Sequence, residues 1–247
     1  MKLITLNTWG GKLYEPLMEF LIKNSEVADI FCFQEVFPCL STPSEFVGEM
    51  RLSLFSDIEK ILTNFNGYHT MAQEDNVGGL AIFIKKSFSV NKFENIVVFK
   101  ELKSVPRGHK DFFTMGRDLQ CLEFDHQGKT YSILNFHGMW NGQGKTDSPK
   151  RIEQSNIVRK NFDETKGLKI LCGDFNLNPD TESVDILAKG NKDLIKEYKV
   201  SSTRSSYYKY PSSFADYVIT SPDVEVKDFK VLSGEVSDHL PLFVEFS

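Results

Sequence analysis

Residues 168–176 read LKILCGDFN, an apolar run that stops abruptly at polar residues. The run Leu168–Cys172 is rich in aliphatic side chains and predicts a buried β-strand. Asp174 and Asn176 follow where this strand ends, and an Asx-turn or a helix cap before Pro179 would explain them. The alternative is that the strand projects both side chains into a functional site.

The same pattern recurs, because eight other short runs are also typical of strands. They are Leu3–Leu6, Ile30–Phe33, Leu80–Ile84, Ile96–Phe99, Leu119–Phe124, Tyr131–Phe136, Tyr217–Thr220 and Leu242–Phe246. Several of them end in polar residues rather than in turn formers. Both hairpins and helix-covered connections are needed to join so many strands, so we expect mixed rather than purely parallel sheets.

Three segments between these runs suit helices. The first has Pro16 in its first turn and ends near Asn24, the second spans residues 44–63, and the third begins at Ser148 and Pro149 and runs to about Phe162. The pattern predicts an α/β fold, a four-layer α-β-β-α sandwich of two mixed sheets packed face to face with helices outside. Since the 247 residues contain no repeat or obvious linker, we expect a single domain over residues 1–247.

Composition narrows the class of protein. A net charge of −5 argues against a large basic surface for nucleic acid, although a local groove or bound cations can supply positive charge. No C-x-x-C pair is present, and Cys32 and Cys172 lie in apolar runs, so we expect reduced core cysteines rather than zinc ligands. The run Leu3–Leu6 is too short for a secretory signal, and no run approaches the roughly 20 apolar residues of a membrane span. We therefore expect a cytoplasmic protein without membrane insertion.

Five side chains with oxygen donors lie where apolar runs end: Asn7, Glu35, Asp174, Asn176 and Asp238. Each alone has an ordinary structural explanation, such as a turn former or a solvated edge charge. Together they suit a hard divalent cation, because oxygen ligands are preferred by magnesium, manganese and calcium.

Six motifs in order resemble the endonuclease/exonuclease/phosphatase superfamily, which includes deoxyribonuclease I, exonuclease III, inositol polyphosphate 5-phosphatases, neutral sphingomyelinases and deadenylases. They are Leu6-Asn7-Thr8-Trp9, Phe33-Gln34-Glu35-Val36, Asn135-Phe136-His137, Gly173-Asp174-Phe175-Asn176, Ala215-Asp216-Tyr217 and Ser237-Asp238-His239-Leu240-Pro241. They extend from residue 7 to residue 241. The resemblance implies a deoxyribonuclease I-like fold and hydrolysis of phosphate esters with Mg²⁺ or Mn²⁺.

The resemblance also implies a role for each motif residue. Asn7 and Glu35 match metal ligands, with Asp238 completing or supporting that shell. Asp174 and Asn176 match the groups that orient the attacking water and the phosphate, and Asp174 is the candidate base.

The histidine motifs carry further implied roles. His239 matches the histidine that binds a phosphate oxygen, and Asp216 matches the carboxylate that fixes its tautomer. His137 matches the second histidine of the deoxyribonuclease I, sphingomyelinase and phosphatase branches. The remaining histidines, His69, His109 and His126, match no motif and are predicted to be surface or loop residues.

Several cations and aromatic residues are candidates for substrate binding. Residues 103–117, which end at Arg117, carry five basic or histidine side chains and suit either a phosphate-binding groove or a solvated loop. Arg204 begins a segment with Tyr207, Tyr208 and Lys209 that suits bases and phosphates. Trp9 follows the predicted metal ligand Asn7, and Trp140 follows His137 by three residues. Each of these indoles would stack on a base or form part of the wall of the site.

Arg151 and Gln154 begin the third helix. A solvated helix face is favoured for them over a phosphate contact.

Three functions fit these observations. The leading hypothesis is a metal-dependent phosphoesterase that hydrolyses phosphodiesters of nucleic acid, acting as a monomer. The second keeps the chemistry but assigns a small phosphorylated metabolite, inositol phosphate or phospholipid headgroup as the substrate. The third is a catalytically silent binding scaffold, and the complete set of motif residues argues against it.

Overall fold

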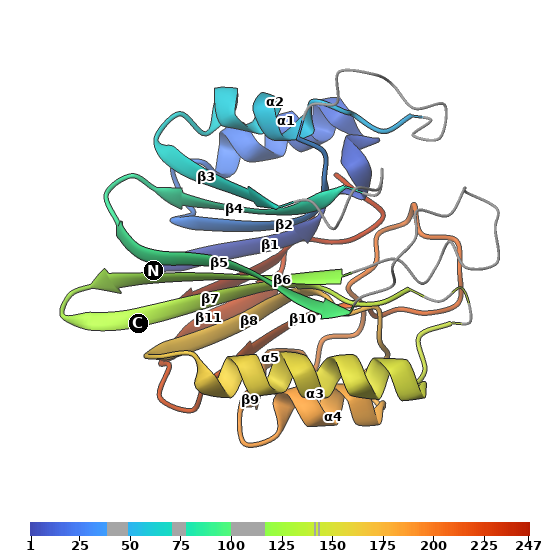
Figure 1. Cartoon of the computed structure of the whole chain (residues 1–247). Helices are drawn as coiled ribbons and strands as arrows, with labels where there is room; N and C mark the ends of the chain where they lie inside the picture. The colour runs from blue at the N-terminus through green and yellow to red at the C-terminus, as the bar shows by residue number, and fades with distance from the viewer. Residues whose placement is uncertain (39–48, 71–77, 100–116, 141, 143) are drawn as a thin grey trace.

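The computed structural model describes residues 1–38, 49–70, 78–99, 117–140, 142 and 144–247. These residues form two six-stranded sheets that lie face to face, with helices on their outer faces (Figure 1). The predicted four-layer α-β-β-α sandwich is confirmed. No helix in the described ranges is both long and apolar enough to cross a membrane.

The first sheet has the strand order β11-β12-β1-β2-β4-β3. Its strands are β1 (Lys2–Asn7), β2 (Ile30–Val36), β3 (Phe65–Thr70), β4 (Gly79–Lys85), β11 (Val226–Val231) and β12 (Leu242–Phe246). β1 and β2 pair in parallel, and the other neighbours pair antiparallel. The sheet is therefore mixed, as predicted.

The second sheet has the order β5-β6-β7-β8-β10-β9. Its strands are β5 (Ser89–Phe99), β6 (Arg117–His126), β7 (Lys129–His137), β8 (Leu168–Asp174), β9 (Lys192–Asp193) and β10 (Asp216–Thr220). Here β7 and β8 are the parallel pair. Parallel neighbours end at the same edge of a sheet, so each sheet brings two strand ends together.

Helices cover the two outer faces of the sandwich. The helices of the described ranges are η1 (Trp9–Gly11), α1 (Tyr14–Asn24), α2 (Leu54–Ile61), α3 (Pro149–Glu164), α4 (Glu182–Ala188) and α5 (Leu194–Glu197). α1 and α2 lie over the first sheet, whereas α3 and α4 lie over the second (Figure 1). The predicted start of α3 is confirmed, because the Ser148 hydroxyl accepts a hydrogen bond from the Arg151 amide and Pro149 occupies the first turn.

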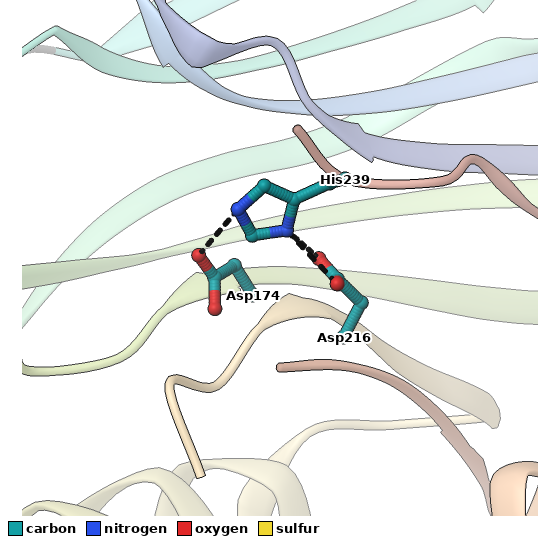
Figure 2. Close-up of side chains that lie close together, drawn as sticks. All are labelled: Asp174, Asp216 and His239. Carbon is teal, nitrogen blue, oxygen red and sulfur yellow. Dashed lines mark hydrogen bonds and ion pairs between the residues drawn. The ribbon is translucent and has the colours of Figure 1, made fainter. Parts of the chain in front are cut away.

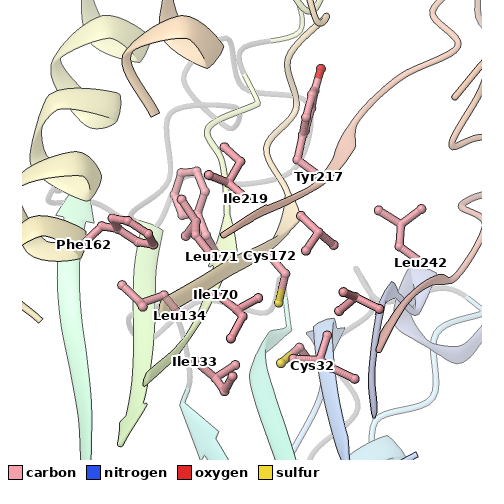
Figure 3. Close-up of a cluster of buried hydrophobic side chains, with 14 of the residues drawn as sticks. Cys32, Ile133, Leu134, Phe162, Ile170, Leu171, Cys172, Tyr217, Ile219 and Leu242 are labelled. Atoms are coloured by element: carbon pink, nitrogen blue, oxygen red, sulfur yellow. The ribbon is translucent and has the colours of Figure 1, made fainter. Parts of the chain in front are cut away.

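Strand alternation divides the apolar side chains between two layers of the core. In the first sheet, Ile4, Phe31 and Phe33 pack with the helices on the outer face. Cys32 belongs instead to the cluster between the sheets, where Cys172 of β8 also lies (Figure 3). Both cysteines are fully buried and free, as predicted, and burial raises the pKa of the Cys32 thiol.

A buried polar chain also joins the sheets. Gln34 of β2 donates a hydrogen bond to Asn135 of β7 at 2.7 Å, and Asn135 donates to Gln120 of β6 at 3.1 Å. Asn135 also donates to the Phe33 carbonyl at 3.0 Å. Because a buried amide is costly without partners, these bonds fix one register of the sheets relative to each other.

Some elements differ from the sequence-based expectation. The helix expected over residues 44–63 is shorter, since α2 begins at Leu54 and residues 49–53 are not helical, while residues 39–48 lie outside the described ranges. β3, β11, α4 and α5 were not predicted. β3 and β11 are largely exposed or half-buried, so they lack a long apolar run. The surface prediction for His69 is wrong, because this residue lies partly buried in β3 with its ring nitrogen 2.9 Å from the Val36 carbonyl.

Candidate active site

The two sheets bring their strand ends together at one edge of the sandwich. Asn7 ends β1, while His137 and Asp174 end the paired strands β7 and β8. Asp216 begins β10 directly opposite Asp174. Asn7 Nδ2 donates to Asp174 Oδ2 at 2.9 Å across 167 residues of sequence, so the motif ends from both sheets meet.

A β-bulge sets the direction of the Glu35 side chain. The pairing of β2 with β4 shifts register between Gln34 and Val36, which leaves Glu35 without a partner in the ladder. Its φ angle is +59°, a left-handed conformation that is uncommon outside glycine. A Cβ atom on Gly78 would lie 2.8 Å from the Glu35 carbonyl carbon, so the bulge is accommodated only because Gly78 has no side chain.

Left-handed backbone also occurs at two other motif residues. Trp9 has φ +52° and Asn176 has φ +55°. The Trp9 amide donates to Asn7 Oδ1 at 2.9 Å, and the Asn176 amide donates to Asp174 Oδ1 at 2.9 Å. Strained backbone of this kind is concentrated at functional sites, where the surrounding structure enforces it.

His239 lies between two carboxylates, with a hydrogen bond to Asp216 and an ion-pair contact to Asp174 (Figure 2). Its Nδ1 lies 2.8 Å and 2.9 Å from the two oxygens of Asp216, while its Nε2 lies 3.6 Å from Asp174 Oδ2. Asp216 is fixed in turn by the Thr203 hydroxyl at 2.8 Å. Although burial lowers the pKa of His239, the Asp216 carboxylate raises it and the net shift is upward. The pairing predicted from the sequence is present.

Asp174 lies close to two histidines, an arginine and a lysine. Burial opposes ionisation, but His239, His137, Arg204 and Lys145 lower the pKa of Asp174 far enough that the net shift is downward. The carboxylate is therefore ionised at neutral pH, as a base must be.

His137 lies 3.7 Å from Asp174 Oδ2 and 4.0 Å from Glu35 Oε1, measured from its Nε2. Burial, reinforced by Arg117, lowers its pKa to about 3. This histidine is thus neutral at physiological pH, and any hydrogen bond it gives to a phosphate is that of a neutral imidazole.

The carboxylates around Glu35 fit a divalent cation. Burial raises the pKa of Glu35, as do the nearby charges of Asp238 and Asp174, while the Asn7 amide opposes the shift. Crowded carboxylates of this kind are relieved by a hard cation with oxygen ligands. Asn7 Nδ2 also donates to Glu35 Oε1 at 3.1 Å, so its amide currently orients this carboxylate.

A second group of potential metal-binding atoms belongs to Asp174, Asp216 and His239, which lie within 4.8 Å of one another. Because His239 Nδ1 is engaged by Asp216, we interpret this group as a hydrogen-bonded pair of His239 and Asp216 with Asp174 beside it. The Glu35 side is the better place for a cation.

Two of the predicted substrate-binding cations are buried beside the carboxylates. Arg204 Nη1 contacts His239 Nε2 and lies 3.3 Å from Asp238 Oδ2, and the Arg204 guanidinium lies over the Tyr208 ring, 3.9 Å from its centroid. Arg117 is 5% exposed, and its Nε donates to the Gly138 carbonyl at 3.1 Å. Burial lowers the pKa of Arg117, while Glu35 and Asp174 raise it, so these charges lie close enough to interact.

The other candidates lie nearer the surface. Trp9 is partly exposed with the Lys12 ammonium 4.4 Å from its ring centroid, and Trp140 is also partly exposed. Tyr207 and Tyr210 are exposed. Residues 103–116 of the predicted basic stretch lie outside the described ranges.

α3 begins where the sequence predicted, but two polar side chains of its first turns are buried. Arg151 and Gln154 are 2% and 3% exposed, so the expected solvated helix face is wrong. Arg151 donates to the carbonyls of Thr146, Met139 and Gly144, and Gln154 accepts from the Met139 amide at 2.9 Å. They anchor the loop after His137.

The fold and the site define a phosphoesterase on a deoxyribonuclease I-like sandwich. The family model described as Endonuclease/Exonuclease/phosphatase family matches residues 4–239, and the chain belongs to that family. Members of this family hydrolyse phosphate esters and generally use a divalent metal. A comparison with curated proteins gives no significant match.

Several solved structures share this fold. A mannosyl-6-phosphatase from Bacteroides thetaiotaomicron is 20% identical with a TM-score of 0.74, covering 100% of this chain and 99% of that one. D. rerio TDP2 complexed with single-strand DNA product is 17% identical with a TM-score of 0.73, covering 100% and 98%. The human Nocturnin catalytic domain with bound sulfate is 21% identical with a TM-score of 0.67, covering 100% and 94%. At these identities the likeness shows the fold alone.

Proposed function

We propose that this phosphoesterase uses Mg²⁺ or Mn²⁺ held by Glu35 and Asp238, with Asn7 as a further ligand or as the residue that orients Glu35. The observation that carries the proposal is the juxtaposition of crowded carboxylates with the Asp216-paired His239. Once bound, the cation would neutralise charge on a phosphate oxygen and on the leaving oxygen.

The protein groups have complementary roles in hydrolysis. Asp174 orients a water molecule and takes its proton as the water oxygen attacks phosphorus, and the bond from phosphorus to the leaving oxygen breaks. The leaving oxygen takes up a proton from solvent, and Asp174 returns its proton to solvent after the step. His239 would donate Nε2–H to a phosphate oxygen that replaces Arg204 Nη1 at this nitrogen, while Asp216 holds its Nδ1. The raised pKa of His239 supports the protonated form. Asn176 and His137 hold the phosphate as neutral donors.

Nucleic-acid phosphodiesters are the first proposed substrate class. The exposed rings of Tyr207 and Tyr210, together with the partly exposed Trp9, support it because aromatic faces stack on bases. A monomer in the cytoplasm remains the expectation from the sequence.

A small phosphorylated metabolite is the second class. Arg117 and Arg204 support it, because they are buried beside the carboxylates rather than spread along an open surface.

An activity panel tests the proposal. The purified protein with Mg²⁺ or Mn²⁺ should release product from at least one of single- and double-stranded DNA, RNA, bis-p-nitrophenyl phosphate or inositol phosphates. His239→Ala and Glu35→Ala should lose this activity, whereas His126→Ala, the same change outside the site, should keep it. Hydrolysis of none of these substrates would favour the silent scaffold, and full activity in Glu35→Ala would show that the site is misplaced.

A further inference from the structure

Lys145 is a buried lysine that no motif predicted. It lies in the loop between β7 and α3 and is 3% exposed. Its Nζ donates to the Phe214 carbonyl at 2.8 Å and lies 5.1 Å from the centroid of the Tyr208 ring. An ammonium group has three donors, and within the described ranges only the bond to Phe214 uses one of them.

Lys145 and Arg204 share the Tyr208 ring as a neighbour. The Arg204 guanidinium lies 3.9 Å from the centroid of the same ring, and its Nη1 reaches His239 and Asp238. Arg204 therefore contacts His239 directly, and Lys145 lies near the same aromatic ring as Arg204.

The loop that carries Lys145 is held firmly. Arg151 donates to the carbonyls of Thr146 and Gly144, on either side of Lys145. The Lys145 carbonyl accepts from the Asn178 amide at 2.8 Å. The ammonium is thus placed before any ligand arrives, which reduces the entropy lost on binding.

The charge of Lys145 calls for an anionic partner. Burial lowers its pKa to about 8, with Arg204 lowering it further and Asp174, Asp216 and Asp238 opposing the shift. The group is charged at neutral pH although it has lost most of its water. A buried charge with unused donors is costly, and an anion that accepts those donors would offset the cost.

The number of phosphate oxygens decides which anion fits. A phosphodiester has two non-bridging oxygens, which the cation and His239 would occupy. A phosphate monoester has three such oxygens and about one additional negative charge near neutral pH. We propose that Lys145 and Arg204 bind the additional oxygen, so that the site prefers a terminal phosphate, on a nucleic-acid end or on a small metabolite, to an internal diester. This inference rests on the proposed phosphoesterase function. It names the form of phosphate on which the site acts, and it places terminal phosphates ahead of the internal phosphodiesters given first under that function.

The test compares two substrates with the same leaving group. We expect the wild-type kcat/KM with Mg²⁺ or Mn²⁺ to be higher for p-nitrophenyl phosphate than for bis-p-nitrophenyl phosphate. Lys145→Met should lower the monoester value by roughly 10- to 100-fold, the loss expected for one hydrogen bond between charged groups, and the diester value by less than about threefold. Lys145→Arg should recover part of the monoester activity.

Lys169→Met is the matched control. Lys169 is also partly buried, with its Nζ 2.8 Å from the Phe162 carbonyl and 5.2 Å from the centroid of the Phe162 ring, but it lies in β8 at the end away from Asp174. The Lys169→Met variant should be less stable than the wild type, but its ratio of monoester to diester kcat/KM should be unchanged. An equal loss on both substrates in Lys145→Met, or a wild-type preference for the diester, would overturn the proposal.

Two further measurements separate this inference from the proposed function. Inorganic phosphate should raise the unfolding temperature of the wild type more than that of Lys145→Met, and this readout needs no turnover. An unchanged phosphate effect in Lys145→Met would count against the inference even if hydrolysis is found. A 5′-phosphorylated oligonucleotide and a hexose 6-phosphate then distinguish the two sources of terminal phosphate. Release of phosphate from either one that is faster than cleavage of internal diesters supports the proposal. Cleavage at internal diesters alone would contradict it.

Discussion

Gly78→Ala tests whether the Glu35 bulge determines activity. The new Cβ would lie 2.8 Å from the Glu35 carbonyl carbon, whereas ordinary contact begins at 3.4 Å, so the bulge must move by about 0.6 Å. A displacement approaching 1 Å at a catalytic group costs on the order of 100-fold in rate, so we expect kcat/KM to fall by roughly 10- to 100-fold. The substitution should also lower the free energy of unfolding. The left-handed φ of +72° at residue 78 accounts for about 1–2 kcal/mol of this loss, and the overlap with Glu35 for a further ~1–3 kcal/mol.

Gly190→Ala provides the control for backbone strain. Gly190 has the same φ of +72°, but a Cβ there would meet no atom within 4 Å. This variant should lose only about 1–2 kcal/mol in urea unfolding and keep full activity on bis-p-nitrophenyl phosphate or p-nitrophenyl phosphate. The reasoning would be refuted if Gly78→Ala kept wild-type kcat/KM, or if both variants lost activity equally.

Three other predictions concern the site and the polar chain between the sheets. Asp216→Asn should lower kcat. It should also shift the fall in activity at rising pH to a lower pH than in the wild type, because the carboxylate that raises the pKa of His239 is gone. An unchanged profile of kcat/KM against pH would contradict the role of this pair. Saturating Mg²⁺, at about 100 times its Kd, should stabilise the wild type by about 2.7 kcal/mol in urea unfolding, and Glu35→Gln should lose most of this gain; equal gains would place the cation elsewhere. Asn135→Leu should destabilise the fold by roughly 2–4 kcal/mol, because its buried partners lose their hydrogen bonds; a loss below about 0.5 kcal/mol in the same assay would mean that the polar chain contributes little.

The sequence predicted the architecture because the core strands are continuous apolar runs. β8 illustrates this, since Ile170–Cys172 is apolar and the chain turns polar at Asp174, where the strand ends. β3 and β11 escaped prediction because their exposed and half-buried residues follow neither a long apolar run nor a strict alternation. Burial that depends on distant parts of the chain leaves no local pattern.

The same limit applies within the site. The motifs predicted the pairing of Asp216 with His239, because both residues have fixed positions in the family pattern. Lys145 has no such signal, since its burial depends on Phe214 and Tyr208, far away in the sequence. The bulge at Glu35 is equally hidden, because it requires the absence of a side chain at Gly78.

The position of β12 in the first sheet has a consequence for biosynthesis. This strand lies between β1 and β11, and the Asp238 and His239 side chains directly precede it. β1 therefore gains its second neighbour only after residues 242–246 have been synthesised, more than 230 residues later in the sequence. Contacts so distant in sequence form slowly, and until they form the edge of β1 is open to pairing with other chains. Until β12 docks, β1 keeps an exposed edge, and His239 is not yet held beside Asp216.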